Sequence, residues 1–413
     1  MEFCMKKILH LIFGRFFVVA MAIILQVLWL CVVLWQLSYK FTYVNLLVRV
    51  IAIIVVLVIV NKWTNPANKL SWTFLILLSP VFGLMVYLLF GRSGLTKHTR
   101  ERMDAVNRQV EALFQRDTAA EEELEKESRS AYLQSSYIDK WAGFPLYQNT
   151  QTKYYRCGEE MFPDMLEALR GAEHFIFLEY FIIEEGYMFN AILDILEEKA
   201  KAGVDVRFIY DDVGSINSIS FGYYKKLQER GIPCVTFNPF KPLISVVMNN
   251  RDHRKIFVVD GYIGFTGGIN LADEYINKVQ RFGYWKDTGV RIEGEAVWSL
   301  TAMFLEMWNY INRSTEDYSR FLPSVYQQKK PDSDGFVQPY GDSPLDNENV
   351  GENIYLNIIS RAKKYVYIFT PYLIIDHEML ICLSNAAKSG VDVRIVTPGV
   401  PDKKAVYLLT QSY

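Results

Sequence analysis

Residues 172–212 read AEHFIFLEYFIIEEGYMFNAILDILEEKAKAGVDVRFIYDD, and this stretch contains the pattern that decides the fold. An apolar run leads into a stretch with helical character, which ends at a glycine and is followed by a second apolar run. Residues 362–399, AKKYVYIFTPYLIIDHEMLICLSNAAKSGVDVRIVTPG, repeat the pattern and share the identical pentapeptide GVDVR. Gly203 and Gly390 stand where the end of a helix favours glycine. Each copy therefore predicts a βαβ element with strands buried on both faces, and the fold class is α/β.

The segment between the two copies predicts a domain boundary. Residues 314–351 are rich in proline, glycine and aspartate, which favours a linker between a first domain at 141–313 and the start of a second at 352–413. Ligands in such folds bind at the carboxyl ends of the strands. Asp211 and Asp212 stand at one such end, and they are interpreted either as a pair that caps the loop or as catalytic carboxylates.

The first 92 residues predict a membrane anchor. The apolar runs Phe16–Trp35 and Ser71–Phe90 both reach the roughly 20 residues that a helix needs to cross a bilayer, and Val44–Val60 is a marginal third candidate. A cleaved signal peptide is the alternative for the first run, but the run is too long and no small-residue cleavage site follows it. We expect two to three transmembrane helices, followed by a charged helical linker over residues 93–140.

The distribution of charge predicts the orientation of this anchor. The chain of 413 residues has 44 basic and 46 acidic residues, a balance that predicts no bulk affinity for nucleic acid. Basic residues gather more densely after the last apolar run than before the first, which favours a cytoplasmic location for everything after residue 90; they are Arg92, Lys97, Arg100, Arg102 and Arg108 against Lys6, Lys7 and Arg15. Basic residues at both ends favour an even number of crossings, whereas hydropathy favours three. Five cysteines without metal or disulfide spacing are typical of a reducing compartment.

Residues 249–270, NNRDHRKIFVVDGYIGFTGGIN, predict a β-hairpin that carries polar groups. Residues two apart on a strand share a face, so His253 and Lys255 should point the same way. The dipeptide at 260–261, Asp-Gly, is typical of a two-residue turn, which pairs position 253 with 268, or with 270 after a shift of one residue. Asn270 therefore returns close to His253, and the glycines at 267 and 268 leave room beside them.

The polar groups of this hairpin suit a tetrahedral phosphate. Histidine can act as a nucleophile, lysine as a fixed cation and asparagine as an amide donor. A lone histidine near a lysine is usually a chance pair of surface residues without a functional role. The pattern H-x-K-x4-D followed by G-G-x-N on a predicted hairpin is far more restrictive.

The segments HRKIFVVD and GFTGGIN resemble the H-x-K-x4-D signature of the phospholipase D superfamily. Together with PVFGLMVYLLFGR, EYFII, YDDVGS, GGINLADEY and TPYLI, they extend the resemblance to the bacterial cardiolipin synthases over essentially the whole chain. The resemblance implies a multi-pass protein of the bacterial cell membrane with two phospholipase D-like repeats. It implies transfer of a phosphatidyl group from one phosphatidylglycerol to another, with release of glycerol and without a metal or other cofactor. It leaves open whether several copies assemble.

The same resemblance implies roles for the residues of the hairpin. His253 is the catalytic histidine that forms a phosphohistidine, and Lys255 is the catalytic lysine that holds phosphate oxygens together with Asn270. Asp260 completes the catalytic signature, with a role more structural than chemical because it lies at the turn.

A later carboxylate usually orients the histidine in this family, and YWKDTGVRIEG makes Asp287 the candidate, on the substrate-binding side of the site. The family more often has arginine and histidine where this sequence has Lys286 and Gly289. The alternative for Asp287 is a solvated carboxylate at the edge of a strand.

The active site of the family uses two signatures, one in each half. His253 follows Gly203 by 50 residues, which places the second histidine near position 440, beyond Tyr413. The remaining histidines lie in no H-x-K setting, and one of them, at 377, is interpreted as a loop residue; they are His10, His98, His174 and His377. We therefore expect the partner of His253 in further residues, or less favourably in a second copy, and we expect no cardiolipin from residues 1–413 alone.

Two other functions stay open from the sequence. One is a hydrolase of the same superfamily that uses water as the acceptor, although the apolar anchor and the neutral charge disfavour its nuclease branch. The other is an inactive, membrane-anchored fragment.

Overall fold

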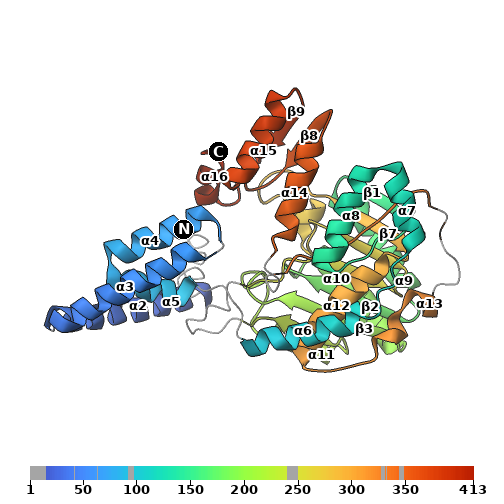
Figure 1. Cartoon of the computed structure of the whole chain (residues 1–413). Helices are drawn as coiled ribbons and strands as arrows, with labels where there is room; N and C mark the ends of the chain where they lie inside the picture. The colour runs from blue at the N-terminus through green and yellow to red at the C-terminus, as the bar shows by residue number, and fades with distance from the viewer. Residues whose placement is uncertain are drawn as a thin grey trace. The chain divides into compact units, whose positions relative to one another are not determined.

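The computed structural model describes residues 15–40, 42–62, 64–91, 97–239, 250–326, 331, 333–343 and 348–413 (Figure 1). These residues form two compact units, which are described separately. The first unit takes the chain up to residue 96 together with 211–217 and 237–251, and the second unit takes the remainder. Lys6, Lys7 and Arg92, which contributed to the predicted orientation, lie outside the described residues.

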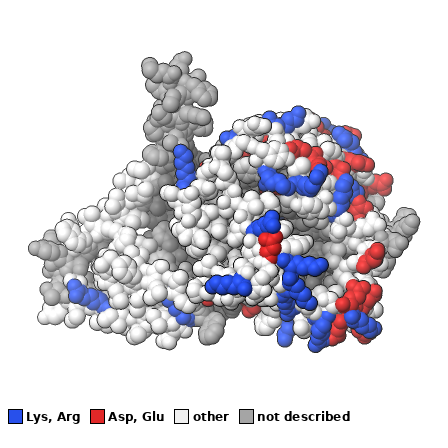
Figure 2. All heavy atoms as spheres, turned by 90° about the horizontal axis from the view of Figure 1, so that it is seen from above, with Lys and Arg blue, Asp and Glu red and all other residues white. Residues whose placement is uncertain are grey.

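The described residues of the first unit before residue 92 form mainly apolar helices. They are α2 (Arg15–Lys40), α3 (Thr42–Asn61), α4 (Pro66–Leu78) and α5 (Pro80–Phe90). Figure 2 shows few charged side chains on this unit, whereas both signs of charge are mixed over the second. Among the described residues one segment, Tyr43–Asn61 in α3, is long and apolar enough to cross a membrane, and Ile24–Val33 in α2 is a shorter apolar stretch. The marginal candidate of the sequence is thus the clearest span in the structure.

The predicted continuous span from 71 to 90 is wrong, because the chain breaks at Ser79. Pro80 has no N–H to donate and keeps the residue before it out of the helical region; Ser79 has φ −140° and ψ 84°. With 13 and 11 residues, α4 and α5 extend about 20 and 16 Å, short of the roughly 30 Å of a bilayer core. Gly83 lets α5 approach α4 closely, since a Cβ there would lie 2.5 Å from the Cα of Ile76.

The second unit is built on a mixed sheet of seven strands in the order β1-β7-β6-β5-β2-β3-β4. The strands are β1 (Thr150–Tyr155), β2 (Phe175–Tyr180), β3 (Asp205–Asp211), β4 (Cys234–Phe237), β5 (Ile256–Val259), β6 (Ile263–Gly267) and β7 (Gly289–Gly294). β2 and β3 are parallel, joined through α10 (Tyr187–Lys201), and nearly all of their residues are buried. Gly203 has φ +92° at the end of α10. The βαβ prediction is therefore confirmed for the first copy.

Helices cover both faces of this sheet. Ile176 and Leu178 belong to the hydrophobic cluster that includes α9 (Gly158–Gly171) and α10. On the opposite face Phe177 stacks on Phe304 of α12 (Val297–Asn312), with ring centroids 4.6 Å apart. The remaining elements of this part of the chain are α6 (Lys97–Glu111), α7 (Thr118–Glu127), α8 (Arg129–Ala142), α11 (Tyr223–Glu229), α13 (Pro323–Tyr326) and the 3₁₀ turns Asp273–Ile276 and Tyr318–Phe321.

The second copy forms the same βαβ element, but the side chains of its strands are less buried. It contains α14 (Val350–Arg361), β8 (Tyr365–Phe369), α15 (His377–Lys388), β9 (Asp392–Val396) and α16 (Lys404–Thr410). Its strands pair in parallel, and Gly390 has φ +93° as predicted. His377, expected in a loop, is the first residue of α15 because Asp376 caps the helix there.

The prediction of two buried faces is wrong for this second copy. Tyr365, Tyr367 and Phe369 are 61%, 49% and 68% exposed. In the first copy Phe175 and Phe177 hold the matching positions, and the rings of Phe321 and Phe304 cover them. The other face of β8 is covered, since Val366 packs with residues of α14 and α15. The described residues thus supply one helical layer to the second copy and two to the first.

The β5–β6 hairpin occupies the middle of the large sheet. Tyr262 N donates to Val259 O, and the turn residues Asp260 and Gly261 have φ 52° and 62°. Val259 pairs with Ile263, so three residues lie in the loop rather than the predicted two. The observed register therefore falls between the two pairings that the sequence suggested.

Asp260 attaches the loop of this hairpin to the start of β2. Its carboxylate accepts hydrogen bonds from the backbone N–H groups of Glu173, His174 and Phe175, at 2.8, 2.7 and 2.8 Å. Asp260 also adopts a left-handed conformation that aspartate and asparagine tolerate better than most residues. Both the side chain and the backbone of this residue are thus used to fix the hairpin.

We expect Asp260→Asn to lower the thermal unfolding midpoint of the protein in detergent. Asparagine tolerates the left-handed backbone but removes the charge and one of the two acceptor oxygens, at a cost of about 1–3 kcal/mol. Asp317→Asn is the matched control, because Asp317 accepts from a single exposed backbone N–H, that of Ser319. Equal midpoints for the two variants would contradict the role assigned to Asp260.

Candidate active site

His253 and Lys255 lie in the segment that leads into β5, and their side chains meet. Lys255 Nζ donates to the carbonyl oxygen of His253 at 2.7 Å and lies 3.2 Å from His253 Nδ1. The His253 side chain is exposed, with its ring centroid 4.7 Å from that of Phe181, whereas Lys255 is 4% exposed. The two residues thus point the same way, with the imidazole toward solvent and the ammonium beneath it.

The surroundings of this pair tune both of its charges. Burial lowers the pKa of Lys255 to about 8, opposed by the negative charges of Asp252 and Asp287. Burial, followed by the charge of Lys255, lowers the pKa of His253 below its usual 6.5, and Lys403 acts in the same direction. At neutral pH the imidazole is therefore uncharged and keeps a lone pair, which a nucleophile requires.

Asn270 is buried, and both ends of its amide are bonded. Its Oδ1 accepts from Ile182 N at 3.0 Å, and its Nδ2 donates to Tyr275 Oη at 2.8 Å. Ile182 follows Phe181, whose ring contacts His253. Asn270 therefore holds the backbone beside the histidine, while its Nδ2 carries a second hydrogen for a ligand.

Asp287 is half-buried beside the glycines of the hairpin. Its Oδ1 accepts from Thr288 N at 2.8 Å, and a Cβ on Gly268 would lie 2.0 Å from that oxygen. The room left by Gly268 is thus taken by the carboxylate of Asp287. Burial raises the pKa of this carboxyl, and the positive charge of Lys255 opposes that effect. The carboxylate is therefore coupled electrostatically to the His253–Lys255 pair.

Asp211 has the loop-capping arrangement that was one of its two interpretations. Its Oδ1 accepts from Val213 N and Gly214 N at 2.9 and 2.8 Å, and it lies 3.3 Å from Arg251 Nη1.

Two of the other histidines have described surroundings outside this constellation. His174 stacks on Tyr326 with centroids 4.4 Å apart, and His377 begins α15.

A group of buried charges behind the histidine was missed by sequence reasoning. Asp252 and Arg254 flank His253, and Glu179 lies inside the otherwise apolar strand β2. Arg254 Nε is 3.4 Å from Glu179 Oε1 and 3.6 Å from Asp252 Oδ1. The signal was present as a carboxylate in an apolar run and as charges on both sides of the signature histidine.

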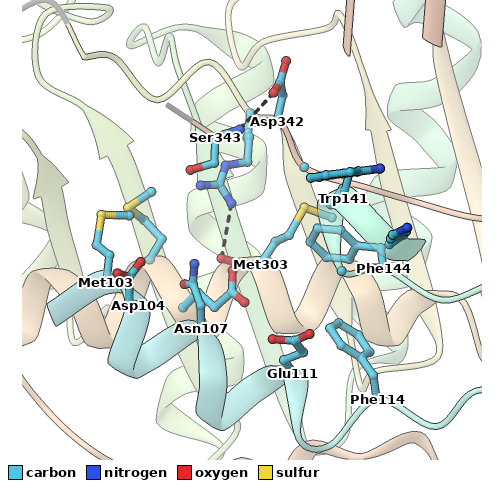
Figure 3. Close-up of a pocket in the computed structure, with 17 residues that line it drawn as sticks. Met103, Asp104, Asn107, Glu111, Phe114, Trp141, Phe144, Met303, Asp342 and Ser343 are labelled. Atoms are coloured by element: carbon cyan, nitrogen blue, oxygen red, sulfur yellow. Dashed lines mark hydrogen bonds between the residues drawn. The ribbon is translucent and has the colours of Figure 1, made fainter. Parts of the chain in front are cut away.

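Arg254 also lines a pocket of about 310 Å³ between α6 and α12. Figure 3 shows Met103, Asp104 and Asn107 of α6 lying opposite Met303 of α12. Glu306 lines the same pocket, and burial raises the pKa of its carboxyl to about 7. The segment 252–255 thus has a solvent-exposed face with His253 and a second face with buried charges.

Family models match both the anchor and the two repeats. The model described as cardiolipin synthase, PLD-like domain, matches residues 165–308 and 355–412, and the model described as phospholipase D-nuclease N-terminal matches residues 50–92. A cardiolipin synthase of Alkalihalophilus pseudofirmus is 38% identical over 84% of this chain and 69% of its own length. The chain belongs to the cardiolipin synthase family of phospholipase D-like proteins.

Two further relatives have similar identity to this chain. A cardiolipin synthase of Halalkalibacterium halodurans is 34% identical over 89% of this chain and 73% of its own length. An uncharacterized protein of Streptococcus mutans serotype c is 43% identical over 87% of this chain and 77% of its own length. The resemblance found in the sequence is thereby confirmed. The match to 50–92 overlaps α3, which supports membrane association.

Glu306 predicts a pH dependence of stability. Its pKa of about 7 in the folded protein lies above the ordinary 4.5, so the folded state binds the proton more tightly. This stabilisation is complete below pH 4.5 and is lost as the pH rises through 7, for a total on the order of 1–3 kcal/mol. Between pH 5.5 and 8 we expect the unfolding midpoint of Glu306→Gln to fall less than that of the wild type in thermal scans.

The control for this prediction is Glu122→Gln, which changes a largely exposed carboxylate. Its pH slope should equal that of the wild type. A Glu306→Gln variant with the wild-type slope would show that Glu306 does not titrate in this range.

Proposed function

We propose that this protein is a cardiolipin synthase that transfers a phosphatidyl group from one phosphatidylglycerol to another and releases glycerol. Support comes from membership of the family over most of the chain. The observation that carries the proposal is the uncharged, exposed His253 imidazole in contact with the buried Lys255 ammonium. A nucleophile and a cation adjacent to each other are what transfer of a phosphoryl centre requires.

In the first step His253 Nε2 attacks the phosphorus of phosphatidylglycerol. A P–N bond forms, the P–O bond to glycerol breaks, and a general acid supplies the proton to the glycerol oxygen. Attack through Nε2 places the ring hydrogen on Nδ1. The phosphate charge draws the Lys255 ammonium toward itself, and Asp287 is our candidate acceptor for the Nδ1 hydrogen because its carboxylate is coupled to Lys255.

In the second step a hydroxyl of another phosphatidylglycerol attacks the phosphohistidine. Its proton passes to the group that protonated glycerol, the P–N bond breaks, and cardiolipin leaves with His253 regenerated. Lys255 and the second N–H of Asn270 stabilise the phosphate oxygens in both steps. Asp260 takes no part in bond making, because its carboxylate is occupied by three backbone N–H groups.

We also propose a multi-pass anchor with the catalytic unit on the cytoplasmic side. The basic residues of α6 support this orientation. A reporter inserted between α6 and α7, after Leu113, should be active as a cytoplasmic fluorescent protein and inactive as a periplasmic-type phosphatase. A fusion after Lys40, on the other side of the apolar α3, is the comparison and should behave in the opposite way. Phosphatase activity at Leu113 would overturn the orientation.

In a version of the protein that also contains the second signature, His253→Ala should reduce the formation of cardiolipin from labelled phosphatidylglycerol by at least about 10³-fold, since the covalent route is lost. Lys255→Ala should be nearly as damaging because the phosphate loses its cation. His174→Ala and Lys286→Ala are matched controls outside the His253–Lys255 pair and should keep most of the activity.

Each other outcome of this assay points to a different function. Release of phosphatidic acid in place of cardiolipin would favour the hydrolase. Turnover by the version with both signatures but not by residues 1–413 alone would identify residues 1–413 as an inactive fragment. Near-normal cardiolipin formation by His253→Ala would show that His253 is not the nucleophile.

A further inference from the structure

Arg254 links the catalytic segment to two other parts of the second unit. It lies between His253 and Lys255 in the chain, and its Nη1 donates to the carbonyl oxygen of Met303 in α12 at 3.5 Å. Its Nε is near Glu179 of β2 and near Asp252. One guanidinium thus connects the sheet, the covering helix and the residue before the histidine.

The same carboxylate that faces this guanidinium also closes a turn around His253. Asp252 Oδ1 accepts from Arg254 N at 3.2 Å. The side chain of Asp252 therefore holds the backbone on the far side of the histidine, while Arg254 holds the side chain of Asp252. His253 lies in the middle of this closed arrangement, and Lys255 follows it directly.

The cluster has more acids than its one cation can balance. Glu179, Asp252 and Glu306 surround Arg254, and the first two are almost completely buried. Burial, and then the charge of Asp252, raises the pKa of Glu179 well above its usual range, so this carboxyl stays protonated. Removing the guanidinium leaves this buried acidic cluster without its cation, which is costly unless the side chains move.

We propose that Arg254 is a positioning residue of the transfer reaction, which fixes the 252–255 backbone through Asp252, Glu179 and the Met303 carbonyl so that Lys255 stays against the His253 ring. The proposal has two consequences. The geometric one concerns the His253–Lys255 contact and does not depend on turnover. The kinetic one rests on the proposed function.

The geometric consequence can be measured as the titration of His253. In the intact protein burial, and then the charges of Lys255 and Lys403, hold the pKa of His253 below 6.5, while the charge of Asp252 opposes them. If the segment loosens, Lys255 moves away from the ring and the pKa of His253 rises toward 6.5. Diethyl pyrocarbonate acylates only the uncharged imidazole, so the pH dependence of labelling of the His253 peptide, read by mass spectrometry, reports this pKa.

The experiment compares Arg254→Met and Arg254→Lys in the whole chain in detergent. Lysine keeps the charge but lacks the planar fork that reaches several acceptors, so a shift in that variant reports positioning rather than charge. We expect the labelling midpoint of both variants to move upward, with the larger movement in Arg254→Met. In the lipid assay, made on the version that also contains the second signature, we expect kcat to fall by about 10²-fold with little change in KM, because the lipid contacts are unaltered while the nucleophile is misplaced.

Arg207→Met is the matched control. Arg207 is a buried arginine on the same sheet, paired with Asp205 at 2.9 Å and with Glu316 at 2.6 Å. Its loss should lower the unfolding midpoint as much as the loss of Arg254, and should leave the titration of His253 unchanged. Stability and positioning are thereby separated.

Two outcomes would overturn the proposal. One is a wild-type titration of His253 in both Arg254 variants, with only the unfolding midpoint lowered. The other is an equal upward shift in Arg207→Met, which would make the effect a general one. If Arg254→Met does not fold, Arg254→Lys still decides the question. If the version that contains the second signature makes no cardiolipin while its His253 midpoint shifts as expected, the proposed function is refuted and this inference stands.

Discussion

The attachment of one hairpin to the start of β2 is the constraint on which the candidate site depends. Asp260 accepts three backbone hydrogen bonds from that strand, and β5 pairs with β2 along its length. Because β5, which follows the segment 252–255, is central in the sheet, His253 lies next to a rigid element and faces solvent. Rigid support of this kind allows a nucleophile to be held in place without contacts to its own reactive nitrogen.

The charged groups on the two faces of the segment 252–255 have different surroundings. On the face that carries His253, burial lowers the pKa of Lys255 and that of His253. The imidazole is therefore neutral, and both side chains can respond to an arriving phosphate. On the buried face Arg254 is surrounded by carboxyls of which Glu179 stays protonated. The two faces share a backbone of four residues, so a change in the buried cluster alters the position of the imidazole.

The two copies of the repeat show how far a pattern and its environment can diverge. Both have the parallel strand pair and the glycine in the left-handed conformation. Phe177 lies under Phe304 of α12, while Tyr367 at the matching position stacks on Tyr365 and remains half-exposed. The pattern of apolar residues predicts that a strand will form, but which faces of the strand are buried depends on the helices that lie against it.

The sequence alone determined the α/β class, the repeat, the helix ends at Gly203 and Gly390, and the signature that identifies the family, because each depends on residues close together in the chain. It also placed His253 and Lys255 on one side, since alternation along an extended segment is local. It did not reveal the break at Ser79, because an apolar run through Pro80 has the composition of a continuous span. The hairpin register, the packing of Asp287 against Gly268 and the cluster around Arg254 were decided only in three dimensions. Each of these brings together residues from separate strands and helices, and the cost of burying their charges and backbone groups is set by neighbours that the local sequence does not contain.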